Sequence, residues 1–288
     1  MSKHKSLAYQ MKQEISSQAK IGSSRHESKK DSADHRHSEF IHSKKTLENT
    51  LDKIGQFGHF ASVKGRKTIA GARPYANEFI QSYTTWASQN TYAAALGRLY
   101  HESADHFTIT AHDTTPTKGR SGVERYVNWD LHKDLLTFQQ GVGLRHGDFY
   151  RQKNLAADDF YEKDGRAFLK VHASKGGRAR VVPVLDEYKD EVKRIVEAAR
   201  STGKGKVFLP TEVPRKGNFH ALRREYAKAL YRQEIASGRC GTGTKEETYY
   251  CRGKRKGECY DKRALSTVAF ALGHSSNRYY TVVHNYMQ

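Results

Sequence analysis

Residues 168–184 read FLKVHASKGGRARVVPV, and this stretch decides the fold of the C-terminal half of the chain. Apolar and polar residues alternate on both sides of Gly176-Gly177, which is the pattern of two half-buried strands. Two glycines between such runs are typical of a tight turn, because glycine takes the positive φ angles that two-residue hairpin turns need. The stretch therefore predicts a β-hairpin.

Three apolar stripes at helical spacing surround this hairpin. Their members are Leu131, Leu135, Leu136 and Phe138; Leu222, Tyr226 and Leu230; and Leu265, Val268, Ala269 and Leu272. The first stripe ends near Gly141, and the second helix opens at Asn218 or Lys216. The third helix fits between Asp261 as N-cap and Gly273 at the C′ position. We therefore expect residues 123–288 to form a mainly α domain with a small antiparallel sheet, of the α+β class.

A separate helical domain is expected at residues 46–107. Apolar residues recur there at helical spacing, at Leu47, Leu51, Ile54, Phe79, Ile80, Tyr83, Trp86, Tyr92, Leu96, Leu99 and Tyr100. Glycine and proline predict breaks between helices at Gly55, Gly58, Gly71 and Pro74. The polar stretch at 108–122, TITAHDTTPTKGRSG, is the predicted linker to the C-terminal domain.

Residues 1–45 are rich in Ser, His and Lys and include SSRHESKKDSADHRHS. Because this stretch carries little apolar periodicity, we expect a mobile basic arm. Three roles stay open for it: a tether for nucleic acid, a tail that binds a protein partner, or a leader that only improves solubility.

The charge of the chain indicates a polyanionic partner. The 288 residues include 50 Lys and Arg against 31 Asp and Glu, which gives a formal net charge of +19. More than half of the excess lies in residues 201–288, where 17 basic and 7 acidic side chains are interleaved with Tyr, Cys, Gly and Phe. This distribution differs from the amphipathic basic helix of a membrane-surface protein. Nucleic acid is therefore the expected partner.

Several classes of protein are disfavoured by what the sequence lacks. No apolar run approaches the ~18–20 residues that span a bilayer, and the first residues lack the apolar core of a signal peptide. Cys240, Cys251 and Cys259 are too few for a disulfide framework and too widely spaced for a CxxC zinc site. No P-loop, dinucleotide fingerprint or paired acidic metal motif occurs. We expect a cytoplasmic, nucleoid-associated protein that uses no metal or cofactor.

Five short motifs carry candidate chemistry. In chain order they are Gly143-Leu144-Arg145, Lys175 before the predicted turn, His220-Ala-Leu-Arg223, Leu272-Gly273-His274, and Tyr286 near the end. A spacing of three on a helix places His220 and Arg223 on one face. Each motif alone is common on protein surfaces, but their order along one chain is far more specific.

This order resembles the tyrosine recombinase (phage integrase) family, in which GLRxxE, a KGxKxRxVP hairpin, HxLR, LGH and a terminal Tyr follow one another. Here the motifs read GLRHGD, KGGRARVVP, HALR, LGH and HNYM. The resemblance covers residues 123–288, and it implies a catalytic domain preceded by a helical core-binding domain at 46–107. It also implies a site-specific DNA recombinase or integrase that acts as a homotetramer, with an accessory protein that bends DNA or promotes excision.

Three features depart from the family pattern. Asp148 replaces the usual Glu and keeps the carboxylate. The segment between HALR and LGH is long and is similar to that of integrases from conjugative elements, which indicates a mobile element. Tyr286 lies twelve residues after His274, a longer spacing than is usual in the family, so Tyr279 and Tyr280 stay open as nucleophiles. We prefer Tyr286 because its surroundings are similar to the family's NR…HYL ending.

The resemblance assigns roles for cleaving a phosphodiester without a metal. Arg145 and Arg223 would hold the scissile phosphate with forked hydrogen bonds. Lys175 would protonate the leaving oxygen, and His220 would accept the tyrosine proton or hold the phosphate. His274 would donate to a non-bridging oxygen.

Tyr286 would attack the phosphate and form a 3′-phosphotyrosine, whose ester keeps the bond energy so that rejoining needs no ATP. Two alternatives stay open: a catalytically inactive DNA-binding relative, and strand passage like that of a type IB topoisomerase. The basic residues expected to contact double-stranded DNA are Lys64, Arg66, Lys67, Arg73, Arg178 and Arg180.

Overall fold

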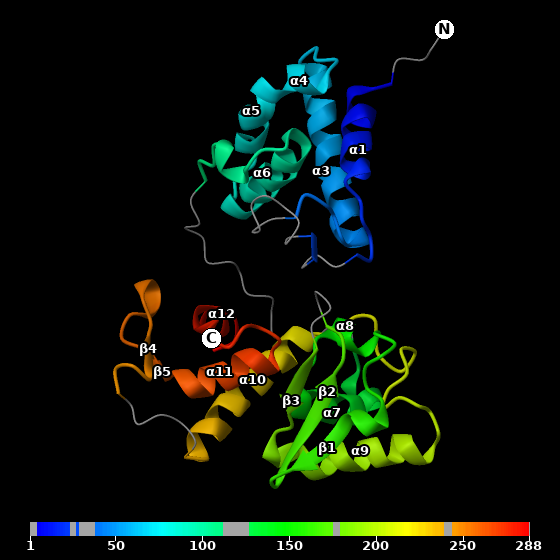
Figure 1. Cartoon of the computed structure of the whole chain (residues 1–288), viewed down its shortest axis with the longest axis vertical. Helices are drawn as coiled ribbons and strands as arrows, with labels where there is room; N and C mark the ends of the chain where they lie inside the picture. The colour runs from blue at the N-terminus through cyan, green and yellow to red at the C-terminus, as the bar shows by residue number, and fades with distance from the viewer. Residues whose placement is uncertain are drawn as a thin grey trace. The chain divides into compact units, whose positions relative to one another are not determined.

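The computed structural model describes residues 5–23, 27–28, 38–111, 127–174, 179–238 and 244–287. The chain divides into two compact units, residues 1–119 and 120–288, and the division falls inside the stretch predicted as a linker. Helices dominate both units, and the second unit adds two small antiparallel sheets (Figure 1). The predicted fold class, mainly α with a small antiparallel sheet, is confirmed. Within the described ranges, no helix combines the length and apolar character needed to cross a membrane.

The described part of the first unit consists of short and medium helices. They are α1 (Leu7–Ser17), α3 (Lys44–Val63), α4 (Ile69–Ala72), η1 (Arg73–Tyr75), α5 (Ala76–Gln81), α6 (Trp86–Tyr100) and η2 (Ala104–His106). Side-chain caps open four of the α-helices, since Ser6, Ser43, Thr68 and Thr85 accept a hydrogen bond from a backbone N–H in the first turn of α1, α3, α4 and α6. Pro74 marks a break as predicted, because it lies in η1 between α4 and α5, whereas Gly71 lies inside α4.

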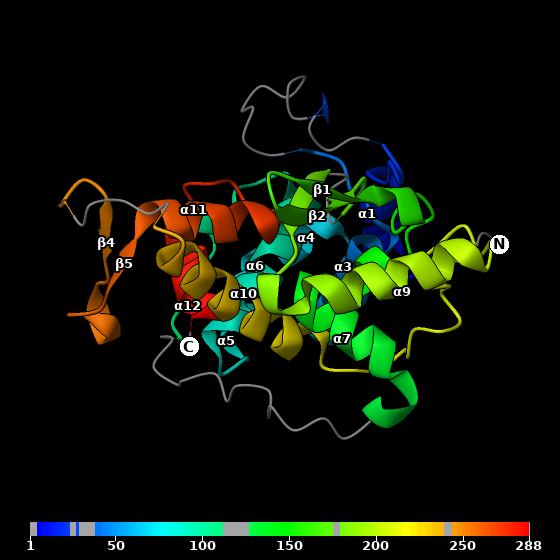
Figure 2. The ribbon, with the colours of Figure 1, turned by 90° about the horizontal axis from the view of Figure 1, so that it is seen from below.

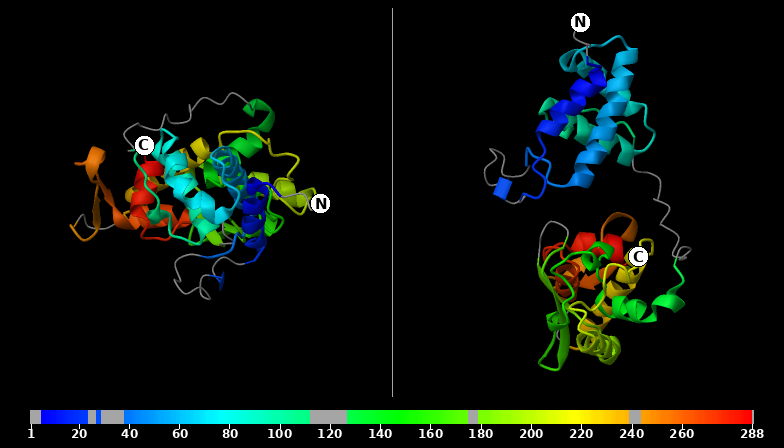
Figure 3. Two further views of the ribbon diagram at one scale, coloured as in Figure 1. Left: turned by 90° about the horizontal axis from the view of Figure 1, so that it is seen from above. Right: turned by 90° about the vertical axis from the view of Figure 1, so that its right-hand side faces the viewer.

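Helix α1 occupies part of the stretch predicted to be a mobile arm. Leu7, Met11 and Ile15 stand four residues apart, so they share one face of the helix, and all three are buried in the core of the first unit. Figure 1 and the right-hand view of Figure 3 both show α1 lying along α3. The expectation of an arm is therefore wrong for this helix. Residues 1–4, 24–26 and 29–37 of the predicted arm lie outside the described residues.

Gly55 and Gly58 lie inside α3, so the breaks predicted there are wrong. A Cβ atom on Gly58 would lie 2.5 Å from the Cα of Ala8, and one on Gly55 would lie 2.6 Å from the Cε of Lys12. Gly58 therefore lets the backbone of α1 approach α3 closely, whereas the contact at Gly55 is with the flexible end of a lysine side chain. The packing this permits offsets the cost of about 1 kcal/mol that a glycine imposes on a helix interior.

The second unit surrounds a three-stranded sheet with helices. Its described elements are η3 (Trp129–His132), α7 (Lys133–Val142), α8 (His146–Phe149), η4 (Ala157–Asp159), β1 (Phe160–Lys163), β2 (Arg166–Val171), β3 (Arg180–Pro183), η5 (Asp186–Tyr188), α9 (Lys189–Ser201), α10 (Phe219–Ala236), β4 (Thr248–Tyr250), η6 (Gly253–Arg255), β5 (Cys259–Asp261), α11 (Lys262–Ala271) and α12 (Tyr279–Tyr286).

The predicted hairpin is formed by β2 and β3, which pair antiparallel with Phe168 opposite Pro183 and Val171 opposite Arg180. The sequence did not indicate β1, which adds to the other edge of β2. The turn itself, residues 175–178, lies outside the described residues. Lys175 and Arg178 are among these four, so their predicted roles stay predictions.

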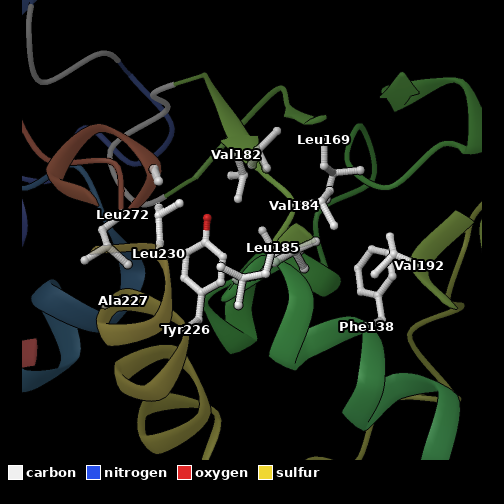
Figure 4. Close-up of a cluster of buried hydrophobic side chains, with 14 of the residues drawn as sticks. Phe138, Leu169, Val182, Val184, Leu185, Val192, Tyr226, Ala227, Leu230 and Leu272 are labelled. Atoms are coloured by element: carbon white, nitrogen blue, oxygen red, sulfur yellow. The ribbon is translucent and has the colours of Figure 1, made fainter. Parts of the chain in front are cut away.

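The core of the second unit lies between the sheet and α7, α10 and α11. Figure 4 shows the Tyr226 ring of α10 among Val182, Leu185 and Leu272, and its hydroxyl donates to the Pro183 carbonyl at 2.7 Å. Burial of these apolar surfaces is the main force that holds the helices on the sheet. Leu131 is the exception among the predicted stripes, since it is 78% exposed.

A second sheet, of two strands, separates α10 from α11 in the sequence. The sequence did not predict this sheet, in which Tyr249 of β4 pairs with Tyr260 of β5. Figure 2 shows both strands beyond the first turn of α11. Strand β5 ends at Asp261, whose side chain accepts from the Ala264 N–H and so caps α11, as the sequence predicts.

Candidate active site

Helix α10 carries His220 and Arg223 in its first turns. The helix begins after Asn218, whose side chain accepts from the Ala221 N–H and confirms one of the two predicted openings. His220 is exposed, whereas Arg223 is only 1% exposed. The Arg223 guanidinium donates to the carbonyl of Gly143 from Nη1 and to the carbonyl of Leu272 from Nη2, both at 2.5 Å.

Arg145 reaches the same carbonyl from another part of the chain. It follows Gly143, which has φ of 54° and ends α7, and it precedes the first turn of α8. Arg145 Nη2 donates to the Leu272 carbonyl at 2.7 Å, and Nη1 donates to Ser174 Oγ at 2.8 Å. The two arginines predicted to clamp a phosphate therefore meet at one backbone oxygen.

That oxygen is presented by the end of α11. Gly273 follows with φ of 68°, which ends the helix at the predicted C′ position, and the His274 N–H donates to the Ala269 carbonyl at 2.8 Å. A Cβ on Gly273 would lie 3.1 Å from Arg145 Nη1 and 3.3 Å from Arg180 Cδ. Glycine at this position supplies both the backbone conformation and the room for two arginine side chains.

Tyr286 faces this group of residues from α12. It is 6% exposed, and its ring centroid lies 5.5 Å from that of His220 and 6.1 Å from that of His274. The Arg223 Cζ lies 5.8 Å from the same ring centroid. The fold thus gathers five of the predicted catalytic residues from segments far apart in the sequence. They are Arg145, His220, Arg223, His274 and Tyr286.

The two competing tyrosines lie elsewhere. Tyr280 is 66% exposed and stacks on His284, with ring centroids 4.0 Å apart. Tyr279 packs near Tyr249, at 5.8 Å, and accepts a hydrogen bond from Ser266 Oγ at 3.4 Å. Tyr280 therefore has the surroundings of a surface residue, and Tyr279 those of a packing residue.

Asp148 and Arg180 form a buried ion pair beneath the site. Arg180 Nη2 donates to Asp148 Oδ2 at 2.8 Å, and both side chains are 2% exposed. Ser174 Oγ donates to Asp148 Oδ1 at 2.7 Å, and Arg180 Nε donates to the Ala271 carbonyl at 2.9 Å. Burial and these partners hold the Arg180 side chain inside the protein, and its predicted contact with DNA stays a prediction.

The site has an excess of buried positive charge. Burial lowers the pKa of Arg145, and the nearby Arg180 lowers it further. Burial likewise lowers the pKa of Arg223 to about 10, with the next contribution from Arg145. Asp148, which pairs with Arg180, is the carboxylate of this network. An anion is the chemical group that would complement this arrangement.

Two buried guanidinium nitrogens of this site have no hydrogen-bond partner among the described residues. They are Arg180 Nη1 and Arg223 Nε. A buried donor without an acceptor costs free energy, of the order of 1–3 kcal/mol, and more when it is charged. Such donors are compatible with a site that binds an oxyanion.

Three of the four basic residues predicted to contact DNA in the first unit are paired within that unit. Their partners are Glu78 for Lys64, the Tyr75 hydroxyl for Arg66, and Glu102 for Arg73. Arg73 makes a forked pair with its carboxylate and lies over the rings of Tyr100 and Phe107. It therefore stabilises the unit itself. Contacts of this cluster, which includes the exposed Lys67, with DNA stay a prediction.

The cysteines do not form a metal site in the described structure. Cys251 is buried and Cys259 is exposed, and Cys240 lies outside the described residues. Among the residues that the structure describes, no cluster of three or more His, Cys, Asp or Glu side chains is arranged to hold a metal ion.

Sequence reasoning missed Ser174, which links Arg145 to Asp148. Serine is too common in loops to stand out, and the link depends on residues 26 and 29 positions away. Its position just before Lys175 was the available signal.

Comparisons with known proteins gave limited likenesses. No family model matches the chain, and no curated protein matches it. Among solved structures, the XerH site-specific recombinase bound to palindromic difH substrate, in a post-cleavage complex, has a TM-score of 0.49 at 15% identity, over 96% of this chain and 91% of that one. The pre-cleavage XerH complex with difH gives 0.47 at 14% identity, over 95% and 89%. XerA recombinase gives 0.31 at 16% identity, over 85% and 89%.

Proposed function

We propose that this chain is a tyrosine-type site-specific DNA recombinase that cleaves and rejoins strands through a 3′-phosphotyrosine intermediate. The proposal rests on one observation: the Tyr286 ring lies beside two histidines and Arg223, and Arg223 and Arg145 converge on the Leu272 carbonyl. Phosphoryl transfer to a protein hydroxyl without a metal needs a nucleophile, positive charge at the non-bridging oxygens and groups that move protons, and these side chains can supply them.

The proposed reaction begins when a phosphate of the DNA backbone enters beside the two arginines. Arg145 and Arg223 donate to its non-bridging oxygens, and the permanent charge of guanidinium stabilises the charge that builds up in the transition state. The oxygen of Leu272 holds both groups at the site before the substrate arrives, so little of their freedom is lost on binding.

Tyr286 supplies the nucleophile in this scheme. Its hydroxyl oxygen bonds to phosphorus, the proton passes to His220, and the bond from phosphorus to the 5′-oxygen breaks. Lys175 is proposed to protonate that leaving oxygen, while His274 donates to a non-bridging oxygen. Rejoining reverses these steps, because the phosphotyrosine ester keeps the energy of the bond that was cleaved.

The surroundings of the three candidate tyrosines support Tyr286 as the nucleophile. Tyr280 is exposed against His284, and Tyr279 packs beside Tyr249. Tyr286, by contrast, has the Arg223 guanidinium over its ring. Excess positive charge on the whole chain favours DNA as the substrate. From the order of the motifs, we further propose that the chain is the integrase of a mobile element and works as a tetramer in the cytoplasm.

Covalent trapping tests the proposal directly. The protein is incubated with a 5′-labelled library of nicked duplexes of random sequence, and covalent adducts are collected under denaturing conditions. We expect an adduct with the wild-type chain, and peptide mass spectrometry should place the nucleotide on Tyr286. Tyr286→Phe should form no adduct yet bind DNA with nearly the same affinity, because phosphate contacts dominate binding.

Each other outcome has a clear meaning. An adduct that persists in Tyr286→Phe and disappears in Tyr280→Phe or Tyr279→Phe would move the nucleophile but keep the class of enzyme. DNA binding by the wild-type chain without any adduct would leave a binding protein in place of a recombinase.

A further inference from the structure

The connection between β4 and β5 contacts the end of helix α12. Arg255, in the 3-10 turn η6, donates from Nη1 to the Val283 carbonyl at 2.5 Å and from Nη2 to the Met287 carbonyl at 3.2 Å. These carbonyls belong to the residues three before and one after Tyr286. One guanidinium group therefore holds the backbone on both sides of the proposed nucleophile.

These contacts act where a helix is least restrained. Tyr286 is the last residue of α12, and the last four carbonyls of an α-helix have no partner within the helix. Arg255 satisfies one of them, at Val283, and places a positive charge at the negative end of the helix dipole. The direction of the Tyr286 ring depends on this last turn.

Arg255 is itself held by Glu258, which precedes β5, and by Tyr260 of β5. Its Nε donates to Glu258 Oε1 at 2.9 Å, and its Nη2 donates to the Tyr260 hydroxyl at 2.7 Å. The Tyr260 hydroxyl donates in turn to Glu258 Oε2 at 2.9 Å, and the Arg255 side chain is only 15% exposed. Because a carboxylate and a hydroxyl both bind the Arg255 guanidinium, its orientation is restrained. It can therefore restrain the α12 carbonyls to which it donates.

The same two-stranded sheet is attached to the other helices of the site. The Asp261 N–H of β5 donates to the Tyr231 hydroxyl of α10 at 2.9 Å, and the Tyr231 and Tyr260 rings lie 5.6 Å apart. Asp261 also caps α11 through its side chain. The segment from β4 to β5 thus joins α10, which carries Arg223, to α11, which ends shortly before His274, and to α12, which carries Tyr286.

We propose that Arg255 is a positioning residue for Tyr286, and that the β4–β5 segment orients the nucleophile relative to the arginines of the site. This inference rests on the proposed function. Arg255 touches neither the phosphate nor the reacting atoms; it acts through the backbone of α12. A displacement of the nucleophile by about 1 Å can cost on the order of a hundredfold in rate.

The test compares cleavage with binding in single-residue variants of the full chain. Arg255→Gln removes the charge and the forked geometry, while Arg263→Gln is the matched control, because Arg263 pairs with Glu247 on the same part of the chain. For each variant, the single-turnover rate of adduct formation is measured at saturating protein on a duplex that the wild-type chain cleaves. The Kd for that duplex is measured separately.

We expect Arg255→Gln to lower the adduct rate at least tenfold with Kd changed less than twofold, and Arg263→Gln to leave both within twofold. Glu258→Gln keeps Arg255 but weakens its tether, so it should lower the rate by about threefold and serves if Arg255→Gln does not fold. Arg255→Lys, which can reach one carbonyl, should recover part of the rate.

An unchanged adduct rate in Arg255→Gln would overturn the inference, as would a parallel loss of rate and affinity, which indicates a purely structural role. If Arg255→Gln does not fold, an unchanged rate in Glu258→Gln would also overturn it. Absence of any adduct with the wild-type chain would instead refute the proposed function.

Discussion

Replacing Asp148 by asparagine removes the carboxylate at the centre of the buried network while keeping its shape. Asp148 is 1% exposed, and its two oxygens accept from Ser174 Oγ at 2.7 Å, from Arg180 Nη2 at 2.8 Å and from the Arg145 N–H at 3.2 Å. An asparagine can accept only on one side and carries no charge. The variant therefore leaves the Arg180 guanidinium buried without a counter-charge.

The size of the effect follows from that burial. Breaking a buried ion pair by removing one partner costs ~3–5 kcal/mol, a large share of the ~5–15 kcal/mol that stabilise a typical domain. For a domain of this size each kcal/mol moves the melting temperature by about 2–4 °C, so we expect a fall of about 6–20 °C. The exposed pair of Asp134 with Arg194, where the side chains are 57% and 59% exposed, offers a matched control.

Thermal and urea unfolding of the full chain measure the loss of stability in Asp148→Asn and in the control variant Asp134→Asn. Asp134→Asn should cost ~0–1 kcal/mol, since exposed pairs are screened by water. The double variant Asp148→Asn with Arg180→Met removes both buried charges, so it should be more stable than Asp148→Asn alone. Equal small losses in Asp148→Asn and Asp134→Asn would show that the buried pair does not hold the site together.

Other perturbations test the site and the first unit. Arg223→Lys should reduce the rate of adduct formation far more than it weakens DNA binding, since lysine cannot reproduce the guanidinium fork, and equal losses in rate and Kd would make Arg223 an ordinary backbone contact. Adduct formation should persist in EDTA, because guanidinium charge stabilises the transition state, whereas dependence on added metal would contradict the tyrosine mechanism. A fragment beginning at residue 123 should show a shallower fall of log affinity with log salt, by about 0.9 for each DNA phosphate that the fragment no longer neutralises, and an unchanged slope would remove the first unit from the interface. Gly58→Ala should destabilise the chain by ~1–3 kcal/mol in thermal unfolding, because its Cβ would meet the Ala8 backbone, while Gly147→Ala, with open space around it, should not; equal effects would refute the close-approach argument.

Local signals in the sequence predicted the helix ends and the hairpin of the second unit. Asn218, Asp261 and Gly273 act where their own side chains or backbone angles decide the outcome, so a short window of sequence is enough to find them. The order of motifs also anticipated that Arg223 and Tyr286 would lie close together, although spacing alone left three tyrosines open.

The sequence could not reveal features that depend on distant partners. From the sequence alone, Gly58 predicts a helix break, because its close contact with the backbone of α1 is visible only in the structure. The burial of Arg180 depends on Asp148, 32 positions away, which pairs with it in the interior and which a short window of sequence does not show. The stripe of Leu7, Met11 and Ile15 was visible in principle, but the Ser- and Lys-rich composition around it favoured an arm.

The acceptor shared by Arg145 and Arg223 is a main-chain oxygen, and this affects which substitutions the site tolerates. Any apolar residue that fits the pocket of the Leu272 side chain still presents that oxygen, so position 272 can vary while both hydrogen bonds remain. Position 273 has no such freedom, because its φ is positive and a side chain there would press on the side chains of Arg145 and Arg180. We therefore expect the side chain at position 272 to tolerate substitution, whereas position 273 has to stay glycine to keep the carbonyl oxygen of residue 272 in place.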